Sequence, residues 1–348
     1  MEAATVDEIP VGAEWQYEPK WDGFRCLAFR RGKKIELQSK SGKPLTRYFP
    51  DVVSELTKLR ATQFVLDGEI AIPIGNRLSF NYLLMRIHPA ASRIRKLADE
   101  TPGMYLVFDL LEDLDGPLIE LPLEKRRHEL EAFAKREFGR VNRIVLSPAT
   151  RDVKTARRWF ASAGKALDGI IAKRSDVEYR ADDRTGMQKI KRQRTADCVV
   201  GGFRYATSGR LVGSLLLGLY DNDGLLHHVG FTSGIPHNLR ADLTRKLEKL
   251  IAPPGFTGNA PGGPSRWSTE RSTKWEPLRP ELVVEVEYDH FTGGRFRHGT
   301  KLLRWRPDKA PRLCRMDQVN QTGAASLTLL TSATKKKVSR KGAKAQRV

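Results

Sequence analysis

Residues 18–25 read EPKWDGFR and place an amine, a carboxylate and a guanidinium at fixed spacing around a glycine. The lysine in this segment, Lys20, is a candidate nucleophile. The pKa of an ordinary lysine is about 10.4, so it would have to fall by about three, at a cost of roughly 4 kcal/mol, to free the amine at neutral pH. A metal ion and neighbouring cations can supply that change. The alternative is that Lys20, Asp22 and Arg25 are solvated charges around a turn.

Strands are expected on both sides of this candidate site. Apolar bursts at 23–30 and 34–39, separated by the turn-like residues RRGK, predict a hairpin directly after Lys20. Further along, FVLDGEIAI and MYLVFDLL carry the β-branched and aromatic residues of buried strands, and two other stretches have apolar residues at helical spacing. The elements predicted from these patterns are strands at 64–72 and 104–111 and helices at 122–138 and 152–163.

The chain changes character near residue 195. Basic sequence gives way to the strand-like segments DCVVGGFRY, RLVGSLLLGLY and LLHHVGFTSG, with a turn at 221–224. A helix at 236–251 follows, and two last strands are expected near 282–288 and 301–305. Five strands with one intervening helix predict a small closed β barrel of the OB type.

Length and charge agree with a division into parts and point to a partner. A chain of 348 residues exceeds the size at which one hydrophobic core usually stops growing. We expect a mixed α+β domain at 1–194, a barrel at 195–319 and a disordered basic tail at 320–348. The net charge is +20, and the seven cations among the last fourteen residues leave +13 on the rest. Such a charge attracts phosphate backbones, so the expected partner is a polyanion.

The cysteines and the apolar runs bear on where the protein works. Cys26, Cys198 and Cys314 form no CxxC pair that could hold zinc and are typical of reduced thiols. No apolar run approaches the roughly 18 residues that cross a membrane, and the N-terminus lacks the pattern of a signal peptide. We therefore expect a protein that stays inside the cell, with no membrane partner.

The segment around Lys20 resembles the first motif, K-x-D-G, of the covalent nucleotidyltransferases, which include DNA ligases, RNA ligases and mRNA capping enzymes. Further segments resemble later motifs in the right order: LDGEIAI at 66–72, VFDLL at 107–111, DGIIAKR at 168–174, MQKIK at 187–191 and RWRPDK at 304–309. The sequences of these motifs are most similar to those of the bacterial ATP-dependent DNA ligases of the C type and of the ligase module of D-type repair ligases. The resemblance implies a nucleotidyltransferase (adenylation) domain of antiparallel sheets and helices, followed by an OB-fold barrel.

The resemblance also implies roles for residues in the first motif. Lys20 would attack the α-phosphate of ATP and carry AMP as a phosphoramidate. Glu18 would accept a hydrogen bond from the adenine amino group, which favours ATP over GTP. Arg25 would contact the ribose or a DNA phosphate, because a guanidinium fork suits an anion.

The middle motifs would hold the rest of the nucleotide. Glu69 and Asp168 would bind a divalent metal, Mg or Mn, or the ribose hydroxyls. Phe108 would stack on adenine, although a phenylalanine on an apolar strand is by itself more often a core residue. Lys189 and Lys191, two apart on one strand face, would neutralise the α-phosphate.

In the last motif, Arg306, Asp308 and Lys309 would orient the pyrophosphate leaving group, which requires the barrel to swing over the nucleotide. The residues expected on DNA are Lys40, Arg192 and Arg194. A flexible basic linker is the alternative for Lys189, Lys191, Arg192 and Arg194.

Two positions depart from the family pattern. Asp168 stands where the family usually has glutamate and is one methylene shorter, so its metal contact is expected to run through water. Lys40 stands where related ligases have arginine, and it keeps the charge but loses the bidentate fork for a 5′-phosphate.

The expected activity is ATP-dependent sealing of nicks in duplex DNA through a lysyl-AMP enzyme and an adenylated 5′-phosphate, in DNA repair. We expect a monomer in the bacterial cytosol, associated with the nucleoid, and the repair assignment leaves a DNA-end-binding protein open as a partner. The alternatives are an RNA ligase, a capping guanylyltransferase that uses GTP, or a basic DNA-binding protein without activity. Glu18 and RWRPDK argue against the capping enzyme, and the intact motifs argue against the inactive protein.

Overall fold

The hairpin predicted after Lys20 is present as strands β3 (Phe24–Arg31) and β4 (Lys34–Ser39) in the computed structural model of the chain. The structure describes residues 2–161, 167–181, 183–207, 209–262, 274–319, 327 and 330. It contains two compact units, Met1–Arg192 and Gln193–Gln321, which are described separately below. The predicted tail at 320–348 lies outside the described residues except for positions 327 and 330.

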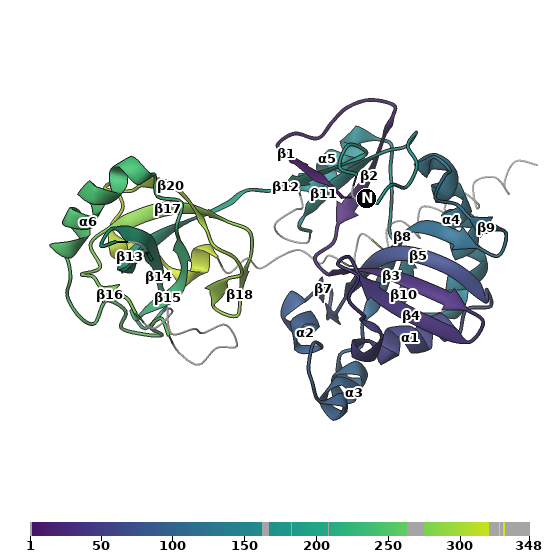
Figure 1. Cartoon of the computed structure of the whole chain (residues 1–348), viewed down its shortest axis with the longest axis horizontal. Coiled ribbons are helices and arrows are strands. Elements are labelled where there is room, and N and C mark those ends of the chain that lie inside the picture. The colour runs from purple at the N-terminus through teal and green to yellow at the C-terminus, as the bar shows by residue number, and fades with distance from the viewer. Residues whose placement is uncertain are drawn as a thin grey trace, which may run out of the picture. The chain divides into compact units, whose positions relative to one another are not determined.

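A large sheet in the first unit has the strand order β10-β8-β5-β3-β4 (Figure 1). The added strands are β5 (Gln63–Ala71), β8 (Met104–Asp113) and β10 (Ile144–Leu146), and the short β9 (Gly116–Pro117) pairs with β8. The pairs are antiparallel except for β10, which runs parallel to β8. Helices α1 (Pro50–Thr57) and α4 (Leu123–Glu137) pack against this sheet and share its core with buried Phe49, Phe64 and Phe133.

A second sheet in the same unit has the order β1-β12-β11-β2. Its strands are β1 (Ala4–Val6), β2 (Trp15–Lys20), β11 (Gly169–Arg174) and β12 (Met187–Lys191), with α5 (Val153–Ala161) packed against it. Strand β2 is an edge, which tolerates Pro19 because no neighbouring strand there needs its missing N–H. The register places Glu18 opposite Ile171 and Lys20 opposite Gly169.

Two motif glycines permit close approach of strands near Lys20. A Cβ on Gly169 would lie 2.1 Å from the carbonyl oxygen of Ile190, and one on Gly23 would lie 2.4 Å from that of Ile70. Both distances are far inside van der Waals contact, so larger residues would push β12 and β5 away. The glycines therefore help to place Lys20 near the side chains of the neighbouring strands.

The prediction of a five-stranded OB-type barrel with one helix is confirmed in the second unit. Its strands follow the order β15-β14-β13-β17-β20, and a bridge between Thr232 and Thr300 joins the two outer strands. The bounds are β13 (Arg194–Tyr205), β14 (Val212–Tyr220), β15 (Leu226–Thr232), β17 (Val283–Tyr288), β20 (Lys301–Trp305) and α6 (Arg240–Glu248).

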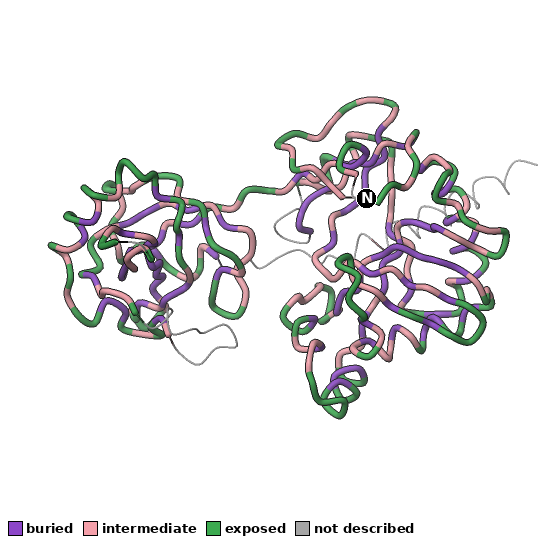
Figure 2. The backbone as a smooth tube through the Cα atoms, viewed as in Figure 1, coloured by how far each residue is buried: buried purple, intermediate pink, exposed green. Residues whose placement is uncertain are grey.

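Small elements complete both units. They are β6 (Pro73–Ile74), β7 (Arg77–Leu78), α2 (Phe80–Met85), α3 (Ala91–Glu100), β16 (Glu276–Pro277), β18 (Phe291–Thr292) and β19 (Arg295–Phe296). Figure 2 shows that burial follows the strands of each unit, with exposed residues in the turns and on the outer helix faces. Among the described residues, no helix has the length and apolar content to span a membrane.

Candidate active site

The two larger sheets of the first unit contribute to one pocket of about 510 Å³. Side chains and backbone of β2, β11, β12 and β1 meet residues of β3, β5 and β8 around it. Seven of the residues predicted for the site line this pocket: Glu18, Lys20, Arg25, Lys40, Glu69, Phe108 and Lys189. Its size and its mixture of cations, carboxylates and an aromatic ring suit a nucleotide.

Lys20, at the end of β2, forms an ion pair with Asp168, the residue just before β11. Lys191 approaches the same carboxylate oxygen at 3.7 Å, so Asp168 lies between two ammonium groups. Burial by itself would lower the pKa of Lys20, but the neighbouring carboxylates, Asp168 above all and then Glu69 and Asp22, together outweigh it and the pKa is raised. The depressed pKa that nucleophilic attack needs is therefore absent in this state, because Asp168 stabilises the protonated amine.

Glu69 on β5 faces the same pocket, and Arg25 is its direct neighbour across the strand pair β3–β5. Removal of the carboxylate from water raises the pKa of Glu69 to about 8, against the opposing effects of Lys20 and Arg25. A carboxylate with such a pKa is largely protonated at neutral pH, and a nearby cation would stabilise its charged form.

The Glu18 carboxylate is buried and held from two sides. Gln16 Nε2 donates to its Oε1 at 2.9 Å, and Lys173 Nζ lies 2.7 Å from its Oε2. The same ammonium group sits 4.4 Å from the centre of the Phe108 ring. Each Glu18 oxygen keeps a lone pair for a further donor, so the expected hydrogen bond from adenine remains chemically possible.

Arg25 is held in the pocket wall by a buried carboxylate. Its Nε donates to Asp67 Oδ1 at 3.1 Å and its Nη2 to Asp67 Oδ2 at 2.7 Å. Asp67 is fully buried on β5, so this bidentate pair fixes the plane of the guanidinium. The guanidinium also lies 5.7 Å from the centre of the Phe108 ring.

Two exposed cations at the pocket mouth share one carboxylate. Lys40 Nζ lies 2.8 Å from Glu2 Oε1, and Arg184 Nη2 lies 2.9 Å from Glu2 Oε2. These two hydrogen bonds lower the pKa of Glu2 to about 2. The side chain expected at a DNA 5′-phosphate, Lys40, is thus paired with an anion in this state.

The remaining predicted basic residues differ in their surroundings. Lys189 lines the pocket, and burial together with the nearby charges of Lys191 and Lys20 lowers its pKa. Arg192 ends the first unit, whereas Arg194 begins β13 in the second and donates to the carbonyl oxygen of Asp289 at 2.6 Å. The two arginines therefore belong to different units.

The last motif is organised within the second unit. Arg306 Nη1 donates to Asp197 Oδ1 at 2.8 Å, and Lys309 Nζ lies 3.5 Å from Asp197 Oδ2. Arg306 also pairs with Asp308 through Nη2 and Oδ2 at 2.8 Å. Asp197 on β13 thus gathers both cations of the motif.

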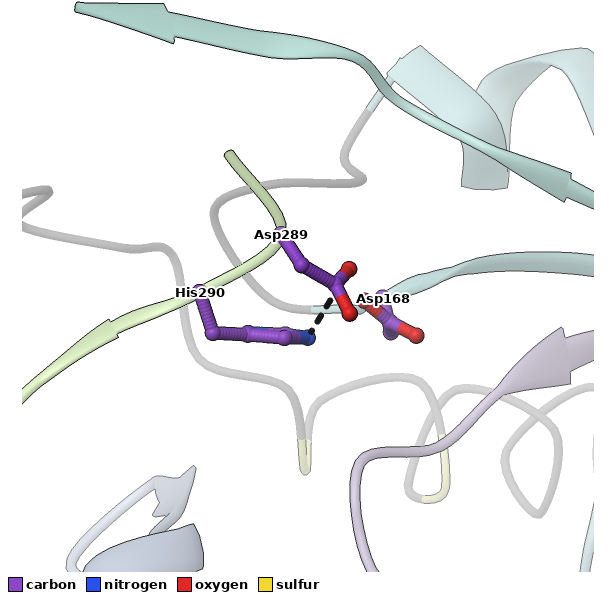
Figure 3. Close-up of side chains that lie close together, drawn as sticks. All are labelled: Asp168, Asp289 and His290. Atoms are coloured by element: carbon purple, nitrogen blue, oxygen red, sulfur yellow. Dashed lines mark ion pairs between the residues drawn. The ribbon is translucent and has the colours of Figure 1, made fainter. Parts of the chain in front are cut away.

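The loop after β17 carries a further acidic and basic pair in the second unit. Figure 3 shows the ion pair between His290 Nε2 and Asp289 Oδ1, which lie 3.8 Å apart. Asp168, drawn in the same figure, belongs to the first unit.

Sequence reasoning missed several residues that hold the predicted ones. They are Gln16, Lys173, Tyr179 and Arg184 in the first unit and Asp197 in the second. A signal was available for Lys173, because a lysine inside the apolar strand GIIAKR must find a partner if it is buried. The other four carried no such signal: Gln16, Tyr179 and Arg184 lie in mixed or polar sequence, and Asp197 stands at the edge of the apolar run DCVVGGFRY.

The raised pKa of Glu69 predicts a gain in stability when its charge is removed. Between the ordinary value of 4.5 and about 8, the folded chain binds more protons than the unfolded chain, so the contribution of Glu69 to stability falls as pH rises. In a chelator at about pH 8.5, Glu69→Gln should melt about 2–5 °C above wild type, and the two should converge near pH 4.5. Thermal melts across pH test this, with Glu36→Gln on the exposed hairpin as control; equal midpoints at high pH would contradict it.

Comparisons with known proteins agree with these features. Residues 3–191 match a family described as ATP dependent DNA ligase domain, and residues 208–309 match the ATP dependent DNA ligase C terminal region. The chain is 44% identical to DNA ligase C2 of Mycolicibacterium smegmatis over 92% of this chain and 93% of the relative. It is 42% identical to DNA ligase C of Mycobacterium tuberculosis over 94% and 95% of the two chains.

A more distant relative and a solved structure extend the comparison. The non-homologous end joining DNA repair protein LigD of Mycobacterium tuberculosis is 29% identical over 86% of this chain, which spans 37% of LigD. A solved structure from work on Lig E DNA ligases shares the fold with a TM-score of 0.53 at 14% identity, covering 88% of this chain and all of that one. Since the family matches span both units and two relatives exceed 40% identity over nearly their full lengths, the chain belongs to the ATP-dependent DNA ligases.

Proposed function

We propose that this ligase carries AMP on Lys20 and uses it to seal nicks in duplex DNA. The amine would form a bond to the α-phosphorus of ATP as the bond to pyrophosphate breaks, and AMP would then pass to the 5′-phosphate at the nick. Attack by the 3′-hydroxyl on that adenylated phosphate would join the strands and release AMP. The observation that carries this proposal is the position of Lys20 in the pocket beside Glu18, Glu69 and Phe108.

Lys20 must change its partner before it can react. Asp168 stabilises the ammonium form, so the amine has to lose both this ion pair and a proton before attack. Glu69 and Asp168 offer the oxygen donors that a hard divalent cation takes, and both carboxylates are close enough to Lys20 to raise its pKa. They would hold Mg or Mn, which neutralises phosphate charge when it is bound.

The base and phosphate ends of the pocket have different chemistry. Glu18, held by Gln16 and Lys173, would accept from the adenine amino group, and Phe108 would stack on the base. Lys189 and Lys191 would neutralise the α-phosphate during transfer.

DNA would meet three of the basic side chains. Lys40 would contact the 5′-phosphate after releasing Glu2, and Arg192 and Arg194 would contact the backbone. The net charge of +20 supports a polyanionic substrate with binding that weakens as salt rises. The name of one relative, the end joining DNA repair protein LigD, supports a place in DNA repair, where an end-binding protein would be the partner.

The motif gathered by Asp197 should act mainly in the first chemical step. Lys309 would orient the pyrophosphate leaving group, which is present only until AMP is on the enzyme. Lys309→Ala should therefore slow adenylation by about 100-fold and leave sealing by pre-adenylated enzyme within about threefold of wild type.

A single-turnover assay tests this separation of steps. Pre-adenylated Lys309→Ala is mixed with nicked DNA without ATP, and its adenylation by ATP is measured in parallel. Lys301→Ala, which removes the same charge from β20, is the control and should adenylate normally. A sealing defect as large as the adenylation defect would show that Lys309 does not act mainly in the first step.

One gel separates the proposed ligase from an RNA ligase or a capping guanylyltransferase. Labelled ATP or GTP is incubated with the protein and a divalent cation, and nicked DNA and nicked RNA duplexes are supplied in parallel. Covalent label from ATP and joining of the DNA nick support the proposal. Label from GTP alone, or joining of the RNA nick alone, would overturn it.

A further inference from the structure

The segment that follows β11 places one phenol behind Arg25, which lines the nucleotide pocket. The Tyr179 hydroxyl donates to Asp67 Oδ2 at 2.9 Å, and Arg25 Nη2 donates to the Tyr179 oxygen at 3.3 Å. Arg25 Nη2 also donates to Asp67 Oδ2 at 2.7 Å. The three side chains therefore form a closed ring of hydrogen bonds around one buried carboxylate oxygen.

Each member of this ring limits the freedom of the others. Two parallel hydrogen bonds to Asp67 define the plane of the Arg25 guanidinium. The phenol donates to a further lone pair of Asp67, whose side chain is fully buried and therefore closed to water as an alternative donor. Burial raises the pKa of Tyr179, so its hydroxyl stays protonated and can donate at neutral pH.

The position of Tyr179 does not depend on its hydroxyl. Its backbone N–H donates to the carbonyl oxygen of Ile119 at 2.9 Å. Its ring packs 5.6 Å from the guanidinium of Arg126, which is fully buried and forms two 3.0 Å hydrogen bonds to Asp109. Loss of the hydroxyl alone should therefore leave the ring and the surrounding fold in place.

We infer that Tyr179 is a positioning residue for Arg25: it locks Asp67 and the guanidinium in the orientation that Arg25 presents to the nucleotide or the DNA phosphate. The inference rests on the proposed function, because it takes Arg25 as a group that contacts substrate. Tyr179 itself need not touch any substrate atom.

The test removes the hydroxyl and asks whether the effect passes through Arg25. In single-turnover sealing by pre-adenylated enzyme, Tyr179→Phe should be about tenfold slower than wild type, the order expected for losing a hydrogen bond to a charged group. Tyr17→Phe is the matched control, because its hydroxyl donates to the carbonyl oxygen of Pro10, away from Arg25. This control should seal at the wild-type rate, and both variants should melt within a few degrees of wild type.

A double variant distinguishes positioning from a general structural effect. Arg25→Lys keeps the charge but has no planar fork to orient. Tyr179→Phe should therefore slow single-turnover sealing about tenfold in the wild-type background. In the Arg25→Lys background the same substitution should slow sealing by less than about twofold.

Two outcomes would overturn the inference while wild-type ligase activity stands. One is a Tyr179→Phe variant that seals as fast as wild type, and the other is a full tenfold loss in both backgrounds. A wild-type protein that neither labels nor seals would instead overturn the proposed function.

Discussion

Lys20→Ala is expected to remove both covalent AMP labelling and nick sealing, with a loss of at least about a thousandfold. The other lysines near the pocket are held elsewhere: Lys173 pairs with Glu18, Lys40 pairs with Glu2, and Lys189 lies on β12. The measurement is incubation with labelled ATP and a divalent cation, followed by a denaturing gel. The label on wild type should be acid-labile, as a phosphoramidate is.

A modified substrate shows whether the defect lies in the lysine adduct alone. Lys20→Ala should still join a nick whose 5′-phosphate already carries AMP, because that reaction begins after the adduct has been used. Lys34→Ala removes an exposed lysine that pairs with Glu36 on the hairpin, and it should label and seal normally. Label that persists in Lys20→Ala would contradict the assignment of the nucleophile.

Alanine at Glu69 or at Asp168 is expected to slow adenylation by about 100-fold, because each removes an oxygen donor for the divalent cation. The two variants should differ in pH dependence. Asp168 raises the pKa of Lys20, so its removal should let the Lys20 amine lose its proton at a lower pH. As pH increases, the adenylation rate of Asp168→Ala should therefore begin to climb at a lower pH than the rate of wild type. Adenylation rates measured against pH and against Mg or Mn concentration test both points.

The control for this pair is a carboxylate close in sequence but outside the pocket. Asp176 follows β11 and pairs with Arg174 at the surface, so Asp176→Ala should adenylate at the wild-type rate. A Glu69 or Asp168 variant that reaches the wild-type rate in saturating cation would show that its carboxylate is not a metal ligand.

The sequence by itself determined the local structure and the family, and it supplied the candidates for the reacting groups. Alternating apolar residues around RRGK specified the β3–β4 hairpin, because side-chain periodicity decides which face of a strand is buried. The five strands and one helix of the second unit were specified in the same way. The order of motifs from Lys20 to Lys309 indicated the family, since each motif is a short contiguous segment whose sequence can be compared directly with that of known families.

Only the tertiary structure decided which charges meet. Lys20 and Asp168 are 148 residues apart and become partners because β2 and β11 pair with Lys20 opposite Gly169. The Arg25–Asp67–Tyr179 ring spans three segments that no local pattern connects. Ionisation likewise depends on the neighbours: Asp168 raises the pKa of Lys20, where sequence reasoning required it to fall, and loss of water raises that of Glu69. A sequence lists ionisable groups, but their distances and their burial, which set their charges, exist only after the sheets have formed.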